Sequence, residues 1–407
     1  MATLARERAA TPAVALVLLL GASVILNYID RGAIGVAGPL IKVDLHLSAT
    51  AFGLAVSAFF WIYAPVQLVL GWLCDRLSVY RMFALGTALW SACTLLMGFA
   101  DGFVSLLLLR LILGIGESIA FPGSSKLICR HVPPERRGLA NAVIAAALAL
   151  GPALGTLLGG SLVAAVGWRA MFMVFGLASA LWLIPWQRVV ATLPANTHTP
   201  ESAFAVGKVI GCRSLWAMGI AHLCGNYPFY FLLAWMPLYL VQQRGLTIIE
   251  MTMLSTLGYG VQAVAAMTLG SFSDRWTRSG RSEAAIRRGM MVVGQLTFGA
   301  CIAGIYWAHD LAIVALLLAL AGACTAAGSL NLYAVAQMFA GRRASGTWVG
   351  VQNAIGNLAG IVGPAISGII IDRAGYGGAF LLTAAVAAFG SLWWAFAVPR
   401  IEPIALD

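Results

Sequence analysis

Charged residues are scarce in this chain. Of its 407 residues, only 10% are Asp, Glu, Lys or Arg, whereas 61% are hydrophobic and the mean hydropathy is +0.89. A soluble domain has roughly 25% charged residues, which cover its surface. This shortage excludes an ordinary water-covered surface and indicates that lipid is the solvent around most of the protein.

The chain also lacks the residue patterns of metal, redox and catalytic sites. Its seven cysteines are scattered, and no pair has the spacing of a metal or redox site. No nucleophile–base pair, metal cluster or phosphate-binding loop can be identified. We therefore expect no cofactor and no metal, and an enzyme is the least favoured class.

The chain contains long runs of apolar residues, which indicate transmembrane helices. A helix needs about 20 mostly apolar residues to cross about 30 Å of hydrocarbon. In lipid the backbone must satisfy its own hydrogen bonds, which leaves helices or a closed barrel, and runs this long exclude the barrel. The twelve expected spans are residues 14–39, 51–73, 82–99, 103–126, 139–166, 171–186, 215–241, 251–272, 290–307, 311–339, 347–371 and 379–398.

Basic residues fall unevenly on the two sides of these spans. With both termini in the cytoplasm, nineteen of the 25 Lys and Arg residues lie on the cytoplasmic side and two lie inside spans. Cytoplasmic loops carry such an excess, so we expect cytoplasmic termini in a bacterial inner (plasma) membrane. Anionic lipid, and not nucleic acid, then explains the net charge of +10. The opposite side holds Lys42, Arg169, Arg244 and Arg373.

Three landmarks recur in the same order and indicate two homologous halves. Internal repeats of this kind are typical of secondary transporters, whose binding site lies near the midplane between the repeats. We expect an N-terminal bundle at residues 1–187, a cytoplasmic linker at 188–213 and a C-terminal bundle at 214–407. The matched landmarks are Gly71-Trp-Leu-Cys-Asp75-Arg76 with Gly270-Ser-Phe-Ser-Asp274-Arg275, Gly151-Pro152 with Gly363-Pro364, and Gly167-Trp168 with Gly375-Tyr376.

The segment Gly71-x-Leu73-x-Asp75-Arg76, with Arg81, resembles the signature between spans two and three of the major facilitator superfamily. The resemblance implies an all-α membrane protein with twelve transmembrane helices in two pseudo-symmetric six-helix bundles. In this interpretation Asp75 accepts from a helix N-terminus, and the Arg residues pair with acids to hold the cytoplasmic side closed. The alternative is a solvated turn. The expected gating residues are Gly71, Asp75, Arg76, Arg81, Gly270, Asp274 and Arg275.

Four charged residues fall inside the expected spans. A charge near the bilayer centre costs about 2.5–3.5 kcal/mol on insertion scales unless it faces a cavity or a partner. The set is either two structural ion pairs or an anion site coupled to protons. An Arg can hold a substrate carboxylate, and a buried acid next to an Arg can gain and lose a proton. The four residues are Asp30, Arg31, Arg110 and Glu117.

The surroundings of these charges resemble the anion:cation symporter family, which includes bacterial sugar-acid (galactonate, hexuronate) and phthalate-type carriers and is related to vesicular glutamate and sialic acid carriers. The segments that carry the resemblance are Asn27-Tyr28-Ile29-Asp30-Arg31, Tyr63, Arg110-x3-Gly114-x2-Glu117, Asn226 to Pro237 and Asn353-x3-Asn357. The resemblance implies that Asp30 and Glu117 couple protons. It implies that the substrate is bound by Arg31, Tyr28, Tyr63, Arg110, Asn226, Tyr230 and Asn353.

The fifth span departs from the pattern of the sugar-acid members. These members carry a Gln that faces the substrate hydroxyls, whereas the register here is Ala145-Ala146-Ala147-Leu148. A site for many hydroxyls needs many donors and acceptors. A less hydroxylated or aromatic carboxylate therefore fits at least as well as a sugar acid. Trp235, Tyr333 and Trp348 are either aromatic walls for such a substrate or packing and lipid-facing residues.

We therefore expect proton-coupled uptake of a small organic carboxylate by alternating access, carried out by a monomer. A proton-driven exporter is the alternative on the same fold, but it needs more of the fifth-span glycine motif than Gly151-Pro152-x-x-Gly155. A solute receptor that transports nothing is a third hypothesis. The sequence leaves the identity of the carboxylate, the proton stoichiometry and the role of His222 open.

Overall fold

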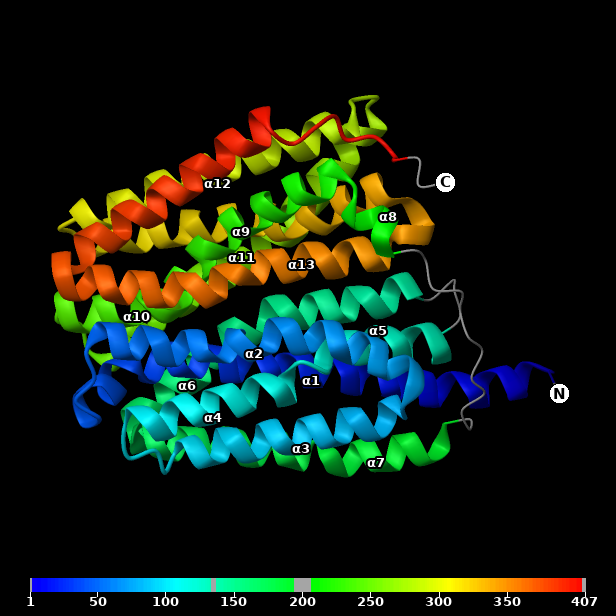
Figure 1. Ribbon diagram of the computed structural model, residues 1–407, viewed down its shortest axis with the longest axis horizontal. Coiled ribbons are helices and arrows are strands. Elements are labelled where there is room, and N and C mark those ends of the chain that lie inside the picture. Colours follow the sequence, from blue (N-terminus) through cyan, green and yellow to red (C-terminus); the bar gives the residue numbers. More distant parts are fainter. Residues whose placement is uncertain (1, 133–136, 194–205, 405–407) are drawn as a thin grey trace. The chain divides into compact units, whose positions relative to one another are not determined.

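The computed structural model describes residues 2–132, 137–193 and 206–404 and folds them into helices, with no strand among them (Figure 1). Eight stretches there are long and apolar enough to cross a membrane. Two of these, Ala146–Thr192 and Trp348–Phe396, have 47 and 49 residues, which is enough for two crossings each. The more polar helices α9 (Arg213–Ala234) and α11 (Ile248–Arg278) complete the expected twelve.

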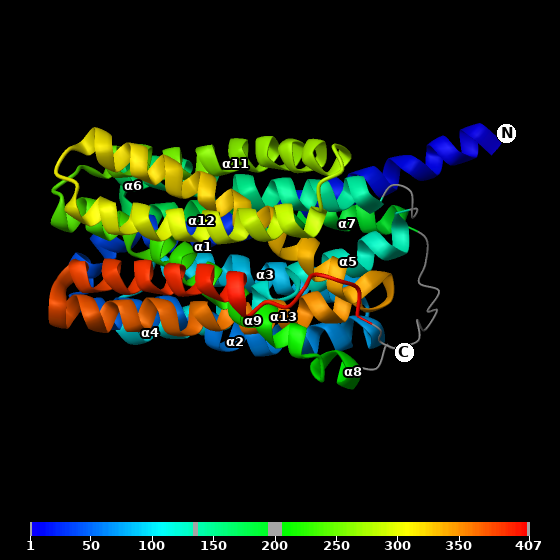
Figure 2. The same ribbon diagram turned by 90° about the horizontal axis from the view of Figure 1, so that it is seen from above.

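Contacts divide the chain into two units. Unit 1 comprises Met1–Leu47 and Ala58–Glu201, and unit 2 comprises Ser48–Ser57 and Ser202–Asp407. Within each unit the long helices run side by side (Figure 2). The remaining helices are α1 (Ala2–Asp44), α2 (Ala49–Arg76), α3 (Val79–Met97), α4 (Phe103–Glu117), α5 (Ala120–His131), α6 (Arg137–Leu181), α7 (Leu183–Thr192), α8 (Val206–Ile210), α10 (Met236–Leu238), the π-helix η2 (Tyr239–Gln243), α12 (Glu283–Trp307) and α13 (Leu311–Phe396).

In unit 1, α6 packs on α1, and α3 packs on α4 and α6. Small residues allow the first contact, because a Cβ atom at Gly155 would lie 2.8 Å from the Ile29 Cα. Close helix packing is therefore enough to explain this glycine of the fifth span. At another level Phe83 stacks on Trp186, which stacks in turn on Trp182, with ring centroids 5.0 and 4.9 Å apart.

In unit 2, α9, α11 and α12 all pack against α13. The 86 residues of α13 do not form one straight rod, because Gly375 has φ +70°. Gly167 inside α6 likewise has φ +84°, a conformation that glycine adopts without steric cost. The two glycines that the repeat predicted to be equivalent therefore make left-handed turns in both copies. They fall where the expected spans five and six, and eleven and twelve, meet.

Two expected spans are interrupted by proline. Residues 103–126 were expected to form one helix, but α4 ends at Glu117 and α5 begins at Ala120. Proline lacks an N–H, and its ring clashes with the carbonyl four residues earlier, which for Pro122 is that of Ser118. In the same way Pro237 follows the end of α9, so α10 and η2 complete the seventh span.

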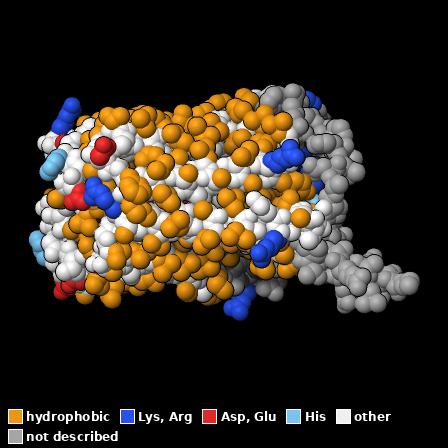
Figure 3. Space-filling model, turned by 90° about the horizontal axis from the view of Figure 1, so that it is seen from below, with side chains coloured by type: hydrophobic (Ala, Val, Ile, Leu, Met, Phe, Trp, Pro, Cys, Tyr) orange, Lys and Arg blue, Asp and Glu red, His pale blue; other side chains and the backbone are white. Residues whose placement is uncertain are grey.

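The surface is apolar along its length. Leu85, Met267 and Phe396 are 70, 78 and 84% exposed. Apolar side chains cover most of the face in Figure 3, and Asp, Glu and His side chains appear at one end. Such a surface is stable against hydrocarbon and not against water. The protein is an integral membrane protein.

Candidate functional site

The four membrane-embedded charges lie together in unit 1. Asp30 and Glu117 are fully buried, and Arg31 and Arg110 are 5 and 2% exposed. Each acid interacts electrostatically with Arg110, and Glu117 also interacts with Arg31. Buried charges are tolerated when opposite charges compensate them, and two acids with two bases give a set with no net charge.

Arg31 is held by one carboxylate and three aromatic rings. Its Nε donates to Glu117 Oε2 at 3.0 Å. Its guanidinium carbon lies 5.0, 4.9 and 4.4 Å from the ring centroids of Tyr28, Phe59 and Tyr63. Aromatic faces attract such a cation. Two of the three rings were predicted from sequence. Phe59 was missed, although it lies four residues before Tyr63 on the same face of α2.

Asp30 faces a different partner. Its Oδ2 accepts a hydrogen bond from the Thr94 hydroxyl at 3.2 Å, and Thr94 is fully buried on α3. Its Oδ1 has no hydrogen-bond partner among the described residues, and the same is true of Glu117 Oε1. Thr94 was not predicted, because one Thr in an apolar span carries no distinguishing signal. Each acid therefore keeps one oxygen on which a proton can reside.

A glycine brings the two basic residues to the same aromatic ring. A Cβ atom at Gly114 would lie 2.5 Å from the Phe59 carbonyl oxygen, so only glycine lets α4 approach α2 this closely. One turn earlier on α4, the Arg110 guanidinium lies 5.0 Å from the Phe59 ring centroid. The spacing Arg110-x3-Gly114-x2-Glu117 thus places a base, a close helix contact and an acid in succession along one helix.

The site residues expected in the C-terminal half lie along a seam between α9 and α13 in unit 2. Asn226 Nδ2 donates to the Gly356 carbonyl at 3.1 Å, and the Tyr230 hydroxyl donates to Asn357 Oδ1 at 2.8 Å. Asn353 Oδ1 accepts from the Tyr333 hydroxyl at 3.2 Å. The three predicted residues are thus engaged with neighbours. Gly356 and Asn357 are partners that the prediction did not include in the site, whereas Tyr333 was a candidate aromatic wall.

His222 belongs to the same seam. It is 4% exposed, and its Nδ1 has no hydrogen-bond partner among the described residues. Its ring lies edge-to-face with Tyr333, with centroids 6.0 Å apart. A Cβ atom at Gly356 would lie 2.5 Å from this ring. His222 and Asn226, one turn apart on α9, therefore both contact Gly356.

Two of the three candidate aromatic walls are packing residues. Trp235 and Trp348 are fully buried. Trp348 stacks on Phe339 at 5.8 Å and donates to Gln352 Oε1 at 3.1 Å. Tyr333, at 37% exposed, remains accessible. The choice that the sequence left open is thus resolved in favour of packing for the two tryptophans.

A family model of the Major Facilitator Superfamily matches residues 20–285 and 280–405. The chain belongs to this superfamily. Among curated relatives, the hexuronate transporter of Bacillus subtilis is 28% identical, over 92% of this chain and 92% of its own length. A probable sulfoacetate transporter of Cupriavidus necator is 29% identical over 92% and 91%. The chloroplastic ascorbate transporter of Arabidopsis thaliana is 26% identical over 93% and 73%.

Solved structures of the superfamily share the fold. A bacterial homologue of the human lysosomal transporter Spinster, in its inward-facing and unoccupied conformation, superimposes with a TM-score of 0.82 at 19% identity. The match covers 95% of this chain and 97% of that one. The expectation of the major facilitator fold is confirmed.

The superfamily's loop signature is only partly visible. Arg81 and Arg275 are exposed, and Gly270 lies within α11, where a Cβ atom would meet Leu330 at 3.7 Å. The pairing of the gating side chains therefore stays a prediction. Side chains outside the described part of the chain include those of the expected gating residues Gly71, Asp75, Arg76 and Asp274.

No group of three or more His, Cys, Asp or Glu residues in the described part of the chain lies close enough to hold a metal ion.

Proposed function

We propose that this protein is a secondary transporter that takes up a small organic carboxylate together with protons. The observation that carries the proposal is the bond between Arg31 and Glu117. Arg31 is the group best suited to hold a substrate carboxylate, and in the closed cluster a carboxylate of the protein already occupies its Nε. Substrate and Glu117 therefore compete for one guanidinium.

Protonation resolves this competition. When Glu117 takes a proton, it loses its negative charge and its ion pair with Arg31 is weakened. Arg31 can then bind the carboxylate of the substrate. Conversely, a bound monoanion gives the neutral cluster a net negative charge, which favours uptake of a proton. Each ligand raises the affinity for the other, as linkage requires. Asp30, with an oxygen that has no hydrogen-bond partner among the described residues, is a second proton acceptor in the same cluster.

The relatives support an anion as substrate. Hexuronate, sulfoacetate and ascorbate, named for the transporters similar to this chain, are all acids. We propose that this chain works as a monomer in a bacterial inner membrane with both termini in the cytoplasm. Alternating access between the two sides follows from the two-fold repeat of the superfamily.

Binding is tested first, on detergent-purified protein. A thermal-shift panel of glucuronate, sulfoacetate, ascorbate and benzoate at pH 5.5 and 7.5 identifies the acid class. A ligand at 100 times its dissociation constant should stabilise the folded state by about 2.7 kcal/mol. The stabilisation should be larger at pH 5.5 and absent in Arg31→Ala. A panel without any shift from acids, but with shifts from cationic compounds, would favour an exporter instead.

Coupling is tested next, as uptake of the labelled acid into proteoliposomes that contain no substrate. An inward proton gradient should drive accumulation in the wild type but not in Asp30→Asn or Glu117→Gln. Exchange of labelled for unlabelled substrate at equal pH reports whether each variant still folds and binds. Glu402→Gln, which removes an exposed acid far along the chain, is the matched control. Wild-type accumulation in both cluster variants would disprove the coupling role.

A further inference from the structure

Four hydroxyl side chains lie in the interior of unit 1, beside the charge cluster. Each is at most 3% exposed, and its oxygen has no hydrogen-bond partner among the described residues. These residues, here called the hydroxyl cluster, are Ser23 on α1, Thr87 and Ser91 on α3, and Ser179 on α6. None was predicted to belong to a site, because one Ser or Thr in an apolar span carries no distinguishing signal.

Three members of the hydroxyl cluster lie on the helix faces that meet at Asp30. On α3, Thr87 and Ser91 lie seven and three residues before Thr94, so they share its face. The Thr94 hydroxyl donates to Asp30 Oδ2 at 3.2 Å. On α1, Ser23 lies seven residues before Asp30 and shares its face in the same way. The hydroxyls of both helices therefore continue the line of the bond between Thr94 and Asp30.

The helices α1 and α3 run parallel along this line. Their first link is the bond between Asp30 and Thr94. Eleven residues earlier on each helix, Leu19 and Phe83 both contact Trp182, at the junction of α6 and α7. The Leu19 carbonyl accepts from Trp182 Nε1 at 3.0 Å, and the Phe83 and Trp182 ring centroids are 5.6 Å apart. The hydroxyls of α1 and α3 lie between these two links.

Ser179 of α6 faces the space between α1 and α3. Three residues before it, Gly176 packs on α3, where a Cβ atom would lie 2.5 Å from the Leu95 nitrogen. Three residues after it, Trp182 bonds the Leu19 carbonyl of α1. Positions three before and three after a helical residue lie about 60° to either side of it. Ser179 therefore points between these two contacts, toward the hydroxyls of α1 and α3.

An aromatic layer closes this polar interior at the end away from Asp30. Phe83 stacks on Trp186, which stacks on Trp182, and the three rings are buried. Leu20 belongs to the same apolar cluster. The hydroxyl cluster thus lies between an acid on one side and an apolar layer on the other.

Buried hydroxyls need hydrogen-bond partners. A polar group that is buried without one is costly, and hydroxyls in helices commonly donate to a carbonyl one turn back. Ser118 donates in this way to Gly114, and Ser161 to Leu157. Buried water typically makes about three hydrogen bonds to polar groups that lack other partners. Hydroxyls from three helices that face a common interior offer that number.

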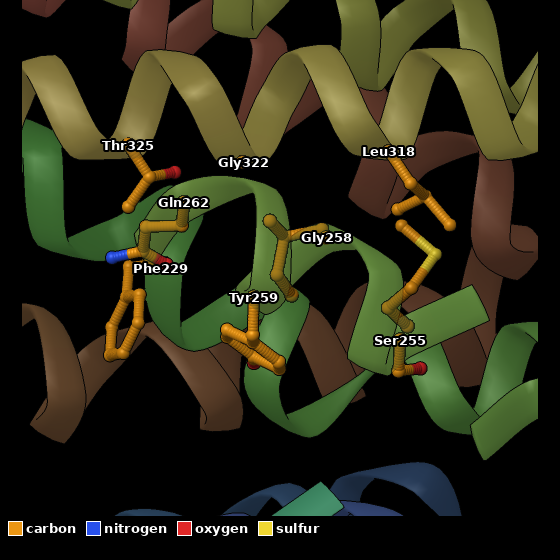
Figure 4. Close-up of a pocket in the computed structure, with 10 residues that line it drawn as sticks. Phe229, Ser255, Gly258, Tyr259, Gln262, Leu318, Gly322 and Thr325 are labelled. Atoms are coloured by element: carbon orange, nitrogen blue, oxygen red, sulfur yellow. The ribbon is translucent and has the colours of Figure 1, made fainter. Parts of the chain in front are cut away.

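Unit 2 arranges its polar side chains differently. Ser255, Tyr259 and Gln262 lie at positions i, i+4 and i+7 of α11 and line a pocket between α11 and α13 (Figure 4). None of the described residues that line this pocket is charged. In unit 1, by contrast, the buried hydroxyls lead to Asp30, a group that can take up and release a proton.

We propose that the hydroxyl cluster binds ordered water through which Asp30 exchanges its proton. This inference rests on the proposed function, in which Asp30 accepts a proton. Each water accepts a proton on one side and donates one on the other, so the route needs no co-reactant. On its other sides Asp30 faces Arg110 and Glu117 of α4. The aromatic layer separates this water from the end of unit 1 at which α1 begins, so that protons do not leak past Asp30.

Two substitutions that remove a hydroxyl with little change of shape test the proposal, Thr87→Val and Ser91→Ala. Thr383→Val in unit 2 is the matched control, because Thr383 is also fully buried but donates to the Ala379 carbonyl at 2.8 Å. The thermal midpoint is measured in detergent. Gradient-driven uptake and exchange at equal pH are measured in proteoliposomes with whichever of glucuronate, sulfoacetate, ascorbate and benzoate gives the largest thermal shift.

Proton-driven uptake should be about tenfold slower in Thr87→Val and in Ser91→Ala, the factor that corresponds to one hydrogen bond. Exchange should match that of the wild type, because a carrier that keeps its proton can return with a new substrate. Thr383→Val should take up the acid as the wild type does. The thermal midpoint of Thr87→Val should fall, because the bound water loses a partner.

The other outcomes contradict the proposal at different points. Unchanged uptake in either variant, or equal loss of uptake and exchange, overturns the proton route while the carboxylate transporter stands. An equal or higher thermal midpoint in Thr87→Val shows a hydroxyl without any partner and overturns the bound water. A wild type in which a proton gradient drives no uptake of any of the four acids overturns the proposed function, and the route with it.

Discussion

Residue 356 has no room for a methyl group. The His222 ring occupies the space that a Cβ atom at Gly356 would need, at 2.5 Å. We expect Gly356→Ala to destabilise the protein by about 1–3 kcal/mol, as overpacking of a core does. The measurement is the thermal midpoint in detergent.

Replacement of His222 by alanine tests whether the His222 ring causes this destabilisation. In Gly356→Ala combined with His222→Ala the clash is gone, so the double variant should be more stable than the sum of the single effects predicts. Gly350→Ala on the same helix, where a Cβ atom meets nothing within 4 Å, should cost nothing. If the effects of the two substitutions on stability are additive, the His222 ring is not what makes an alanine at position 356 destabilising.

At this scale the sequence predicted the charges better than their partners. Asp30, Arg31, Arg110 and Glu117 were identifiable because charges are rare inside apolar runs. Phe59 and Thr94, which contact these charges, resemble any other residue of a lipid-embedded helix, so nothing in the sequence distinguishes them. Contacts between helices arise from packing, and a single chain without its fold carries no record of which faces meet.

At the scale of elements, α11 begins with a reciprocal cap. The Thr247 hydroxyl accepts from the Glu250 N–H, and Glu250 Oε2 accepts from the Thr247 N–H at 2.9 Å and from its hydroxyl at 2.8 Å. Such a capping box satisfies helix donors that would otherwise lack partners. Thr247→Ala should therefore destabilise the protein by about 1 kcal/mol, measured as a lower thermal midpoint.

The same cap gives a pH dependence. The bonds from Thr247 hold the pKa of Glu250 below its ordinary value of 4.5. A carboxyl with a lowered pKa stabilises the folded state fully above its ordinary value and loses this effect as the pH falls through the lowered pKa. The stability advantage of wild type over Glu250→Gln should thus be complete at pH 6 and shrink below pH 4.5. If the stability difference between wild type and Glu250→Gln stays constant across this pH range, the protonated carboxyl of Glu250 caps the helix as well as the carboxylate does.

Helix breaks were the least predictable elements. The span expected at residues 103–126 is confirmed as one apolar stretch, Phe103–Ile128, but its helix is broken after Glu117. The span expected at 215–241 is likewise divided among α9, α10 and η2. A proline inside a transmembrane helix can leave a kink or an interruption, because neighbouring helices can satisfy the freed backbone groups. Which result occurs depends on packing, and here Pro122 and Pro237 interrupt the helix.

For the whole molecule, the distribution of Lys and Arg predicts the orientation in the membrane. A fluorescent protein that folds only in the cytoplasm should be bright when fused after Arg400. Alkaline phosphatase, which folds only outside the cytoplasm, should be active when inserted at His309, between α12 and α13. The opposite pattern at both sites would reverse the assigned orientation.

The number of spans and the repeat could be read from the sequence because both depend on composition and order alone. Gly167 and Gly375 were matched by position, and both have a positive φ angle. The sequence could not predict that Asn226 and Tyr230 of α9 are hydrogen-bonded to Gly356 and Asn357. Such pairing depends on the distance between two helices, which the apolar pattern does not encode.

The polarity of α11 has a consequence for how the chain enters the membrane during synthesis. Insertion by the translocon depends on the apolarity of each segment, and polar residues near the centre of a helix oppose it. Ser255, Tyr259 and Gln262 therefore weaken the helix as an autonomous insertion signal, and α11 relies on the helices before and after it. Gln262→Leu should therefore improve insertion of the isolated segment.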